Sequence, residues 1–221
     1  MFYTLKTYLR LLIVALVVLF IQSSLSISPV HSQDITIGTQ TWTSKNLEVS
    51  TFRNGEAIPE AKSKEELAKA GENKTAAFCY YYFDSKSGKV YGKLYNWYAV
   101  NDSRGLAPKG YHIPSDAEWT ILTNFLGGED LAGEKLKSKQ GWKKNGKKSG
   151  NGNNSSGFNA LPGGGNNYPD ILNITDEGSW WSSSEGRFYN ACVRSMYYFN
   201  TKVTRFIYHK KVGYSVRCLR D

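Results

Sequence analysis

The sequence predicts an α+β fold in which two short helices pack on an antiparallel sheet beside a long irregular loop region. Three observations lead to this prediction. A helix with recognisable ends follows Pro114, the stretch 141–178 is rich in Gly, Asn, Ser and Lys, and several strand-like segments come after that stretch. Helices that precede a run of antiparallel strands are typical of the α+β class.

The amino-terminal part of the domain predicts short elements. The alternating segment 34–49 indicates one or two strands with a turn at Gly38. Residues 63–70 indicate a surface helix in which Ser63 begins a capping box and Gly71 ends the helix.

The next stretch is dense in aromatic residues. Residues 75–84 therefore predict a buried strand, and residues 85–88 predict a turn after it. The segment 90–100 is expected to be extended or weakly helical, and to belong to the core.

The helix after Pro114 carries its own start and stop signals. Ser115 is the candidate N-cap, and Glu118 three residues later can complete a capping box. Gly127 and Gly128 can adopt the left-handed conformation with which many helices end. Apolar residues recur at helical spacing and predict one buried face, which consists of Trp119, Leu122 and Leu126, widened by Ile121 and Phe125.

A second short helix is expected near residues 129–139, with Leu131 and Leu136 facing inward. The stretch 141–178 follows, and loops of such length in a compact domain are usually functional or mobile. The last part of the chain predicts strands of one antiparallel sheet, namely SWWSSS (179–184), NACVRSMYYF (190–199), KVTRFIYH (202–209) and GYSVRCLRD (213–221).

Residues 1–32 have the composition of a signal peptide. Two basic residues precede an unbroken apolar run from Leu11 to Ile21, which is too short to span a bilayer comfortably, and a small polar segment follows. Small residues favour cleavage between Ser32 and Gln33, with a site near Ser26 as an alternative, and an uncleaved anchor is the other interpretation. The mature protein is then exported and periplasmic, on the outer surface or secreted.

Composition narrows the class of protein. The chain has 221 residues, of which 40% are hydrophobic and 14% aromatic, too many for a disordered chain and enough for a single domain over residues 33–221. Loss of the signal peptide would lower the net charge from +9 to +7, because two basic residues and no acidic ones are removed. A basic exported domain favours anionic polymers or surfaces, whereas no motif indicates a nucleic-acid partner.

Several motifs, in order, resemble one bacterial family. The chain from about Ile35 to Asp221 is similar to the Fibrobacter succinogenes major paralogous domain, which occurs mainly in secreted and surface proteins and has no settled activity. The family's opening strand is expected to pair with its carboxyl terminus. The motifs that carry the resemblance are GKLYNWYAVND (92–102), PKGYHIPSDAEWTILTNFLGG (108–128), GFNALPGG (157–164), WWSSSE (180–185) and GYSVRCLRD (213–221).

Two of these motifs also resemble a wider superfamily. HIPSDAEW (112–119) and the closing GYSVRCLRD are similar to motifs of the formylglycine-generating enzymes, which implies a C-type-lectin-like fold. The resemblance does not extend to the residues that catalysis needs. The oxidases bind copper through two close cysteines, whereas Cys192 and Cys218 are 26 positions apart; iron-dependent relatives need three histidines, whereas only His112 and His209 follow the signal peptide. We therefore expect no enzyme, no metal and no cofactor.

The three cysteines predict one disulfide and one leftover thiol, because an exported protein meets an oxidising compartment. Cys79 and Cys218 lie in the motifs of the resemblance, which favours their pairing, although Cys192–Cys218 remains open. Cys192 is then expected to be a small buried residue.

These observations predict an exported, non-catalytic binding module for polysaccharide or another cell-surface component. Exposed aromatic rings stack on sugars, and amide or charged groups bind hydroxyls, so such a site leaves no sharp motif. Trp142 and Tyr168 are the aromatic residues least expected to be buried. A structural or adhesive envelope protein is the alternative, and an oxidase of the formylglycine-generating type is third. The candidate ligand-binding residues are Trp142, Asn166, Asn167, Tyr168, Asp170 and Arg187.

Overall fold

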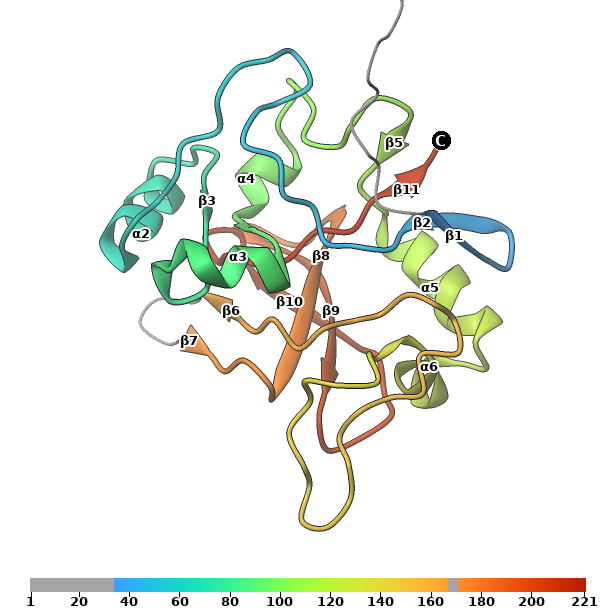
Figure 1. Cartoon of the computed structure of the whole chain (residues 1–221). Helices are drawn as coiled ribbons and strands as arrows, with labels where there is room; N and C mark the ends of the chain where they lie inside the picture. Colours follow the sequence, from blue (N-terminus) through green and yellow to red (C-terminus); the bar gives the residue numbers. More distant parts are fainter. Residues whose placement is uncertain (1–33, 167–170) are drawn as a thin grey trace, which may run out of the picture. The chain divides into compact units, whose positions relative to one another are not determined.

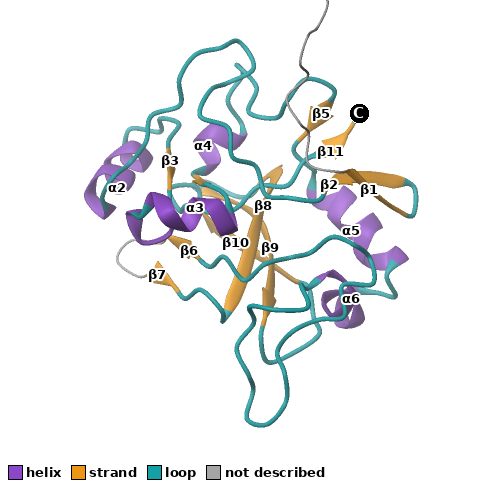
Figure 2. Cartoon of the chain, viewed as in Figure 1, coloured by secondary structure: helices purple, strands orange, loops and turns teal. Residues whose placement is uncertain are grey.

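A computed structural model describes residues 34–166 and 171–221 (Figure 1). The chain divides into two units, Met1–Ser32 and Gln33–Asp221, and every described residue belongs to the second. The predicted signal peptide thus lies outside the described residues. The second unit has short helices and antiparallel strands, so the predicted α+β class is confirmed (Figure 2). Within the described ranges, no helix has both the length and the apolar character that a membrane crossing requires.

A three-stranded antiparallel sheet forms the centre of this unit, in the order β10-β9-β8. Its strands are β8 (Glu177–Glu185), β9 (Asn190–Tyr197) and β10 (Thr204–His209). Adjacent residues of a strand point to opposite faces, so Trp180 and Trp181 enter two different hydrophobic clusters. In Figure 1, α5 and α6 lie on one side of β8 and β9, and α2, α3 and α4 lie on the other.

A second sheet joins the two ends of the domain, with strand order β1-β2-β11-β5. The expected pairing of the opening segment with the carboxyl terminus is confirmed, because Leu219 of β11 pairs with Trp42 of β2. The prediction that 213–221 belongs to the same sheet as the preceding strands is wrong. The strands of this second sheet are β1 (Asp34–Ile37), β2 (Gln40–Thr43), β5 (Tyr111–His112) and β11 (Leu219–Arg220).

Helix α5 (Asp116–Phe125) has the predicted ends. The side chain of Ser115 accepts from the Glu118 amide, and the Ser115 amide donates to Glu118 Oε2 at 2.7 Å, which completes the capping box. At the other end the Gly127 amide donates to the Asn124 carbonyl at 3.1 Å and the Gly128 amide to the Thr123 carbonyl at 2.9 Å, a Schellman motif. Both glycines have positive φ, which this ending requires of Gly127, the first residue after the C-cap Leu126.

The buried face of α5 is narrower than predicted. Trp119, Leu122 and Leu126 are buried, but Ile121 is 49% and Phe125 63% exposed. The helix packs against β8, β9 and α6 on one side only, so residues flanking that stripe remain at the surface. Helix α6 (Glu129–Leu136) shows the same pattern, because Leu136 is buried and Leu131, predicted to face inward, is exposed.

Arg194 connects these two helices to the central sheet. Its guanidinium is almost fully buried and pairs with Asp116 at 2.9 Å and with Glu129 at 2.5 Å. Because Asp116 begins α5 and Glu129 begins α6, one side chain of β9 sets the position of both helix starts.

Helix α2 (Lys64–Glu72) begins at the predicted N-cap, Ser63, but the prediction that Gly71 ends it is wrong. The helix continues through Gly71, and a Cβ at that position would lie 2.2 Å from Cβ of Lys211. Gly71 is therefore required by the close approach of α2 to Lys211 rather than by a helix end.

The aromatic stretch after α2 forms several short elements instead of one strand. The prediction of a strand over 75–84 is wrong beyond Phe78–Cys79, and the predicted turn at 85–88 is instead helical, because the Asp84 side chain caps α3 by accepting from the Lys86 amide. The remaining elements are β3 (Phe78–Cys79), η1 (Tyr81–Phe83), α3 (Ser85–Tyr91), β4 (Leu94–Tyr95), α4 (Trp97–Val100), β6 (Gly165–Asn166) and β7 (Ile171–Leu172).

Replacement of the N-cap in Ser115→Ala should destabilise the protein by about 1 kcal/mol, because the Glu118 amide loses its acceptor. Chemical denaturation followed by tryptophan fluorescence measures the change. Ser103→Ala, at an exposed position that caps no helix, is the matched control and should alter the free energy of unfolding by less than about 0.5 kcal/mol. Equal stability of the two variants would contradict the capping role.

Candidate functional site

A hollow of about 260 Å³ lies where the loop after α6 meets the turn between β9 and β10. In Figure 1 this loop is the yellow stretch at the bottom of the view. We call it the loop hollow. Its lining includes two aromatic residues and three amides, which are Tyr198, Phe199, Asn145, Asn151 and Asn200.

The aromatic residues of the loop hollow are partly open to solvent. The side chain of Phe199 is 52% exposed, and its ring meets that of Tyr198 edge-on with centroids 5.3 Å apart. A ring exposed beside a hollow offers an apolar face to a ligand, which a buried core ring does not.

The amides of the loop hollow are oriented by the backbone. The oxygen of Asn151 accepts from the Trp142 amide at 2.9 Å, and that of Asn200 accepts from the Lys202 amide at 3.0 Å. Within residues 34–166 and 171–221, the NH2 groups of Asn151 and Asn200 donate to no protein acceptor. Two fixed amides thus retain donors for a ligand, and Glu134 adds a carboxylate acceptor to the lining.

Lys137 fastens the three segments that form the hollow. Its side chain is buried, and Nζ donates to the carbonyls of Gly150 at 2.8 Å, Tyr197 at 3.1 Å and Asn200 at 2.8 Å. An ammonium has three N–H groups, so these three carbonyls use all of them. Burial lowers the pKa of Lys137 to about 8, so the group is still largely protonated at neutral pH.

Trp142 lies beneath the loop hollow, and the prediction that it is exposed is wrong. Its side chain is 5% exposed, and the indole N–H reaches both Ser138 Oγ and the Ala160 carbonyl at 3.1 Å. The ring also contacts Lys137, whose Nζ lies 5.1 Å from its centroid. Trp142 therefore anchors the loop to the core and supports Asn151 through its amide, rather than contacting a ligand.

Of the other predicted ligand-binding residues, the two that the structure describes, Asn166 and Arg187, do not line this hollow. Asn166 is 2% exposed, and its NH2 group donates to the Tyr80 carbonyl at 2.8 Å, which indicates a structural role. Arg187 is exposed in the turn between β8 and β9, at the opposite end of β9. The remaining predicted residues, Asn167, Tyr168 and Asp170, lie outside the described residues. Sequence reasoning missed Phe199 and Asn200, although an aromatic run that ends in asparagine, YYFN, could have indicated an exposed strand end.

The predicted disulfide between Cys79 and Cys218 is wrong, because all three cysteines are free and buried. Cys79 packs in one hydrophobic cluster and Cys218 in another, so the two thiols do not meet. Burial raises the pKa of both thiols to about 12, and neither is a thiolate at neutral pH. Cys192 is buried, as predicted.

His112 lies between two carboxylates rather than in a metal centre. Its Nε2 is 2.9 Å from Glu118 and its Nδ1 is 2.8 Å from Asp221. Partial burial lowers the pKa of His112, but the bonds to Asp221 and Glu118 outweigh burial and leave it raised. Across the described part of the chain, no cluster of His, Cys, Asp and Glu is suited to hold a metal ion.

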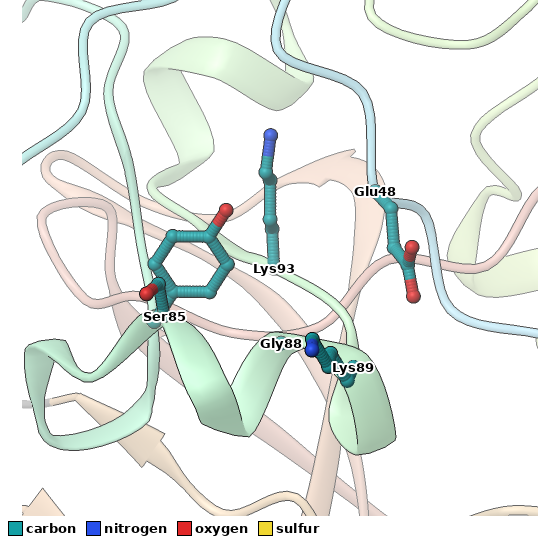
Figure 3. A pocket seen from close by; sticks show the side chains of 6 residues that line it. Glu48, Ser85, Gly88, Lys89 and Lys93 are labelled. Carbon is teal, nitrogen blue, oxygen red and sulfur yellow. The ribbon is translucent and has the colours of Figure 1, made fainter.

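A further hollow, of about 210 Å³, lies beside α3 (Figure 3). In Figure 3 Glu48 and Ser85 stand on opposite sides of Lys93, whose ammonium points away from the helix. Lys93 is buried, and its Nζ lies 4.0 Å from the centre of the Phe78 ring. The one ring in this lining, Tyr80, is half-buried and packs edge-on against Phe78, whereas the loop hollow has the exposed ring of Phe199, so the loop hollow is the better candidate site.

The buried charge of Lys137 predicts a pH dependence. The folded-state pKa lies below the unfolded value of about 10.4, so between about pH 8 and about pH 10.4 the unfolded chain binds more protons. The free energy of unfolding of the wild type, relative to Lys137→Met, should therefore rise with pH in this window, by at most about 1.4 kcal/mol per pH unit. Urea titrations across the window measure it. Lys139→Met, at an exposed neighbouring position, is the control and should show no such pH dependence. If the difference in free energy of unfolding between the wild type and Lys137→Met does not change with pH, the burial of a charged amine at Lys137 is refuted.

Comparison with known proteins agrees with the motifs. No curated protein and no solved structure shows significant similarity to the chain. The model of the Fibrobacter succinogenes major domain, by contrast, matches residues 35–220, nearly all of the second unit. The chain belongs to the Fibrobacter succinogenes major domain family.

Proposed function

We propose that the protein is an exported, non-catalytic module that binds polysaccharide in the loop hollow. One observation carries the proposal: the exposed ring of Phe199 stands beside Tyr198 in a hollow that is also lined by oriented asparagine amides. A sugar presents an apolar C–H face and a rim of hydroxyls, so its recognition needs these two kinds of group together.

The loop hollow is also preorganised. Lys137 joins the loop, the end of β9 and the following turn, and Trp142 anchors the loop in the core. A ligand then binds without having to order these segments, which saves the conformational entropy that flexible binding loops lose. The buried thiols and the paired His112 support a role in binding rather than catalysis.

We also propose a C-type-lectin-like fold and export. The fold is supported by the pairing of β2 with β11, the two helices α5 and α6, and the long irregular stretch after them. Export is supported by the composition of residues 1–32, with their short apolar run.

The variant Phe199→Ala should lower the affinity for a neutral polysaccharide by about tenfold, because the stacking face is lost, and should leave the melting temperature nearly unchanged. Affinity electrophoresis of the mature protein against a panel of xylan, mannan and β-glucan, followed by calorimetry on the best binder, measures the effect. Phe188→Ala is the matched control, since Phe188 is an even more exposed ring, at 87%, on the opposite turn of the sheet.

Equal affinity of the Phe199→Ala variant and the wild type would place the binding elsewhere and overturn the site. If the folded protein binds no member of the panel but self-associates in sedimentation experiments, the polysaccharide role is rejected in favour of a structural or adhesive one.

A further inference from the structure

A second hollow with aromatic walls, of about 170 Å³, lies at the other end of β9, where the turn between β8 and β9 meets the end of α2. We call it the hairpin hollow. Its lining combines three rings with three charged residues, which are Tyr98, Tyr189, His209, Glu72, Lys74 and Lys211.

The rings of the hairpin hollow form a partly exposed platform. Tyr189 is 57% exposed, and its ring is parallel to the imidazole of His209, with centroids 5.9 Å apart and an angle of 5° between the planes. Nδ1 of His209 accepts from the Lys211 amide at 3.2 Å, which assigns the ring proton to Nε2. Burial, Lys211 and Lys210 lower the pKa of His209, so at neutral pH the imidazole is an uncharged ring.

The charges of the hairpin hollow are mostly positive. Lys74 and Lys211 outnumber the single carboxylate, Glu72, so the lining carries a net charge of +1. The Nζ of Lys74 lies 5.7 Å from the centre of the Tyr189 ring, which places an ammonium directly beside the stacking face. The close approach of Gly71 to Cβ of Lys211 fixes the base of the second lysine.

The turn that carries Tyr189 is fastened by a buried lysine. The side chain of Lys210 pairs with Glu185 and donates to the Phe188 carbonyl at 3.2 Å, and its backbone amide donates to the Tyr189 carbonyl at 2.7 Å. Its Nζ also lies 4.7 Å from the centre of the Trp97 ring. The platform is therefore held in place, as the loop hollow is held by Lys137.

We infer that the hairpin hollow is a second saccharide site and that it binds a carboxylated sugar of the uronate type. A neutral sugar needs only the rings and hydrogen-bonding groups, whereas ammonium groups beside the platform select a carboxylate. The site does not depend on the loop hollow, because the two share no lining residue.

The two hollows lie at opposite ends of β9, whose eight residues span about 25 Å at the usual rise of a strand. A single acidic polysaccharide, or two different chains, can therefore occupy both, and linked sites raise the apparent affinity beyond that of either alone. The net charge of +7 expected after signal cleavage adds a general attraction for such polymers.

The test compares an oligogalacturonate that is too short to span both hollows with a neutral galactan oligosaccharide of the same length, using calorimetry and amide chemical shifts of the mature protein. We expect the acidic probe to bind and to shift the amides of residues 188–190 and 209–211. Tyr189→Ala should weaken its binding by about tenfold and Lys74→Gln by about threefold, and raising NaCl from about 50 mM to about 500 mM should weaken it as well.

Two control variants show whether the acidic probe binds in the hairpin hollow. Lys109→Gln, which removes an exposed lysine elsewhere, and Phe199→Ala, which alters the loop hollow, should both keep wild-type affinity for the acidic probe. Equal shifts of the amides of residues 188–190 and 209–211 by the neutral and acidic probes, or equal losses in Lys109→Gln and Lys74→Gln, would overturn the inference. A loss caused by Phe199→Ala but not by Tyr189→Ala would assign the acidic probe to the loop hollow and likewise overturn it.

Discussion

The buried guanidinium of Arg217 is the constraint on which the arrangement of the domain depends. A buried charge is tolerated only where hydrogen-bond acceptors surround it. Arg217 finds them on separate parts of the chain: the Thr43 carbonyl at 2.8 Å, the Phe158 carbonyl at 2.9 Å and the Asn46 side chain at 2.7 Å. Burial lowers its pKa to about 9, so the group remains charged at neutral pH. One side chain near the carboxyl terminus therefore holds the amino-terminal hairpin and the long loop against the terminal strand.

A buried cation that binds backbone carbonyls is also found at both ends of the central sheet. Lys137 lies against Trp142 and donates to carbonyls of the loop and of the β9–β10 turn. Lys210 lies against Trp97 and donates to a carbonyl of the β8–β9 turn. The loop after α6 is rich in Gly, Asn and Lys and has few apolar side chains with which to pack, so the buried ammonium of Lys137 helps to order it by binding its Gly150 carbonyl. Each fastened turn also presents exposed aromatic rings, Phe199 at one end and Tyr189 at the other. The buried ammonium groups of Lys137 and Lys210 thus hold in place the two surfaces that we propose for binding.

Local signals made parts of the fold predictable. The ends of α5 were predictable because the capping box and the Schellman motif involve residues within a few positions of one another. Helix α3 was missed because its one signal, Asp84, follows an aromatic run that favours a strand. The end of α2 was misplaced because Gly71 serves a contact with Lys211, and nothing near Gly71 in the sequence indicates that partner. The outward position of Ile121 and Phe125 depends likewise on which elements cover α5.

The sequence by itself determined the class of fold, the family and the pairing of the domain's opening segment with its carboxyl terminus, because sequence motifs or short-range patterns indicate each of them. Only the tertiary structure decided which aromatic residues reach solvent. Trp142 lies among Gly, Lys and Asn in the sequence and Phe199 ends an aromatic run, yet the first is buried and the second exposed. The difference arises because Ser138 and Ala160 close over the indole of Trp142, whereas Phe199, in the turn after β9, contacts the neighbouring rings of Tyr197 and Tyr198 and stays half exposed. The cysteines are a further example. Their number predicted a disulfide, but the tertiary structure places Cys79 and Cys218 in separate hydrophobic clusters and so keeps them apart.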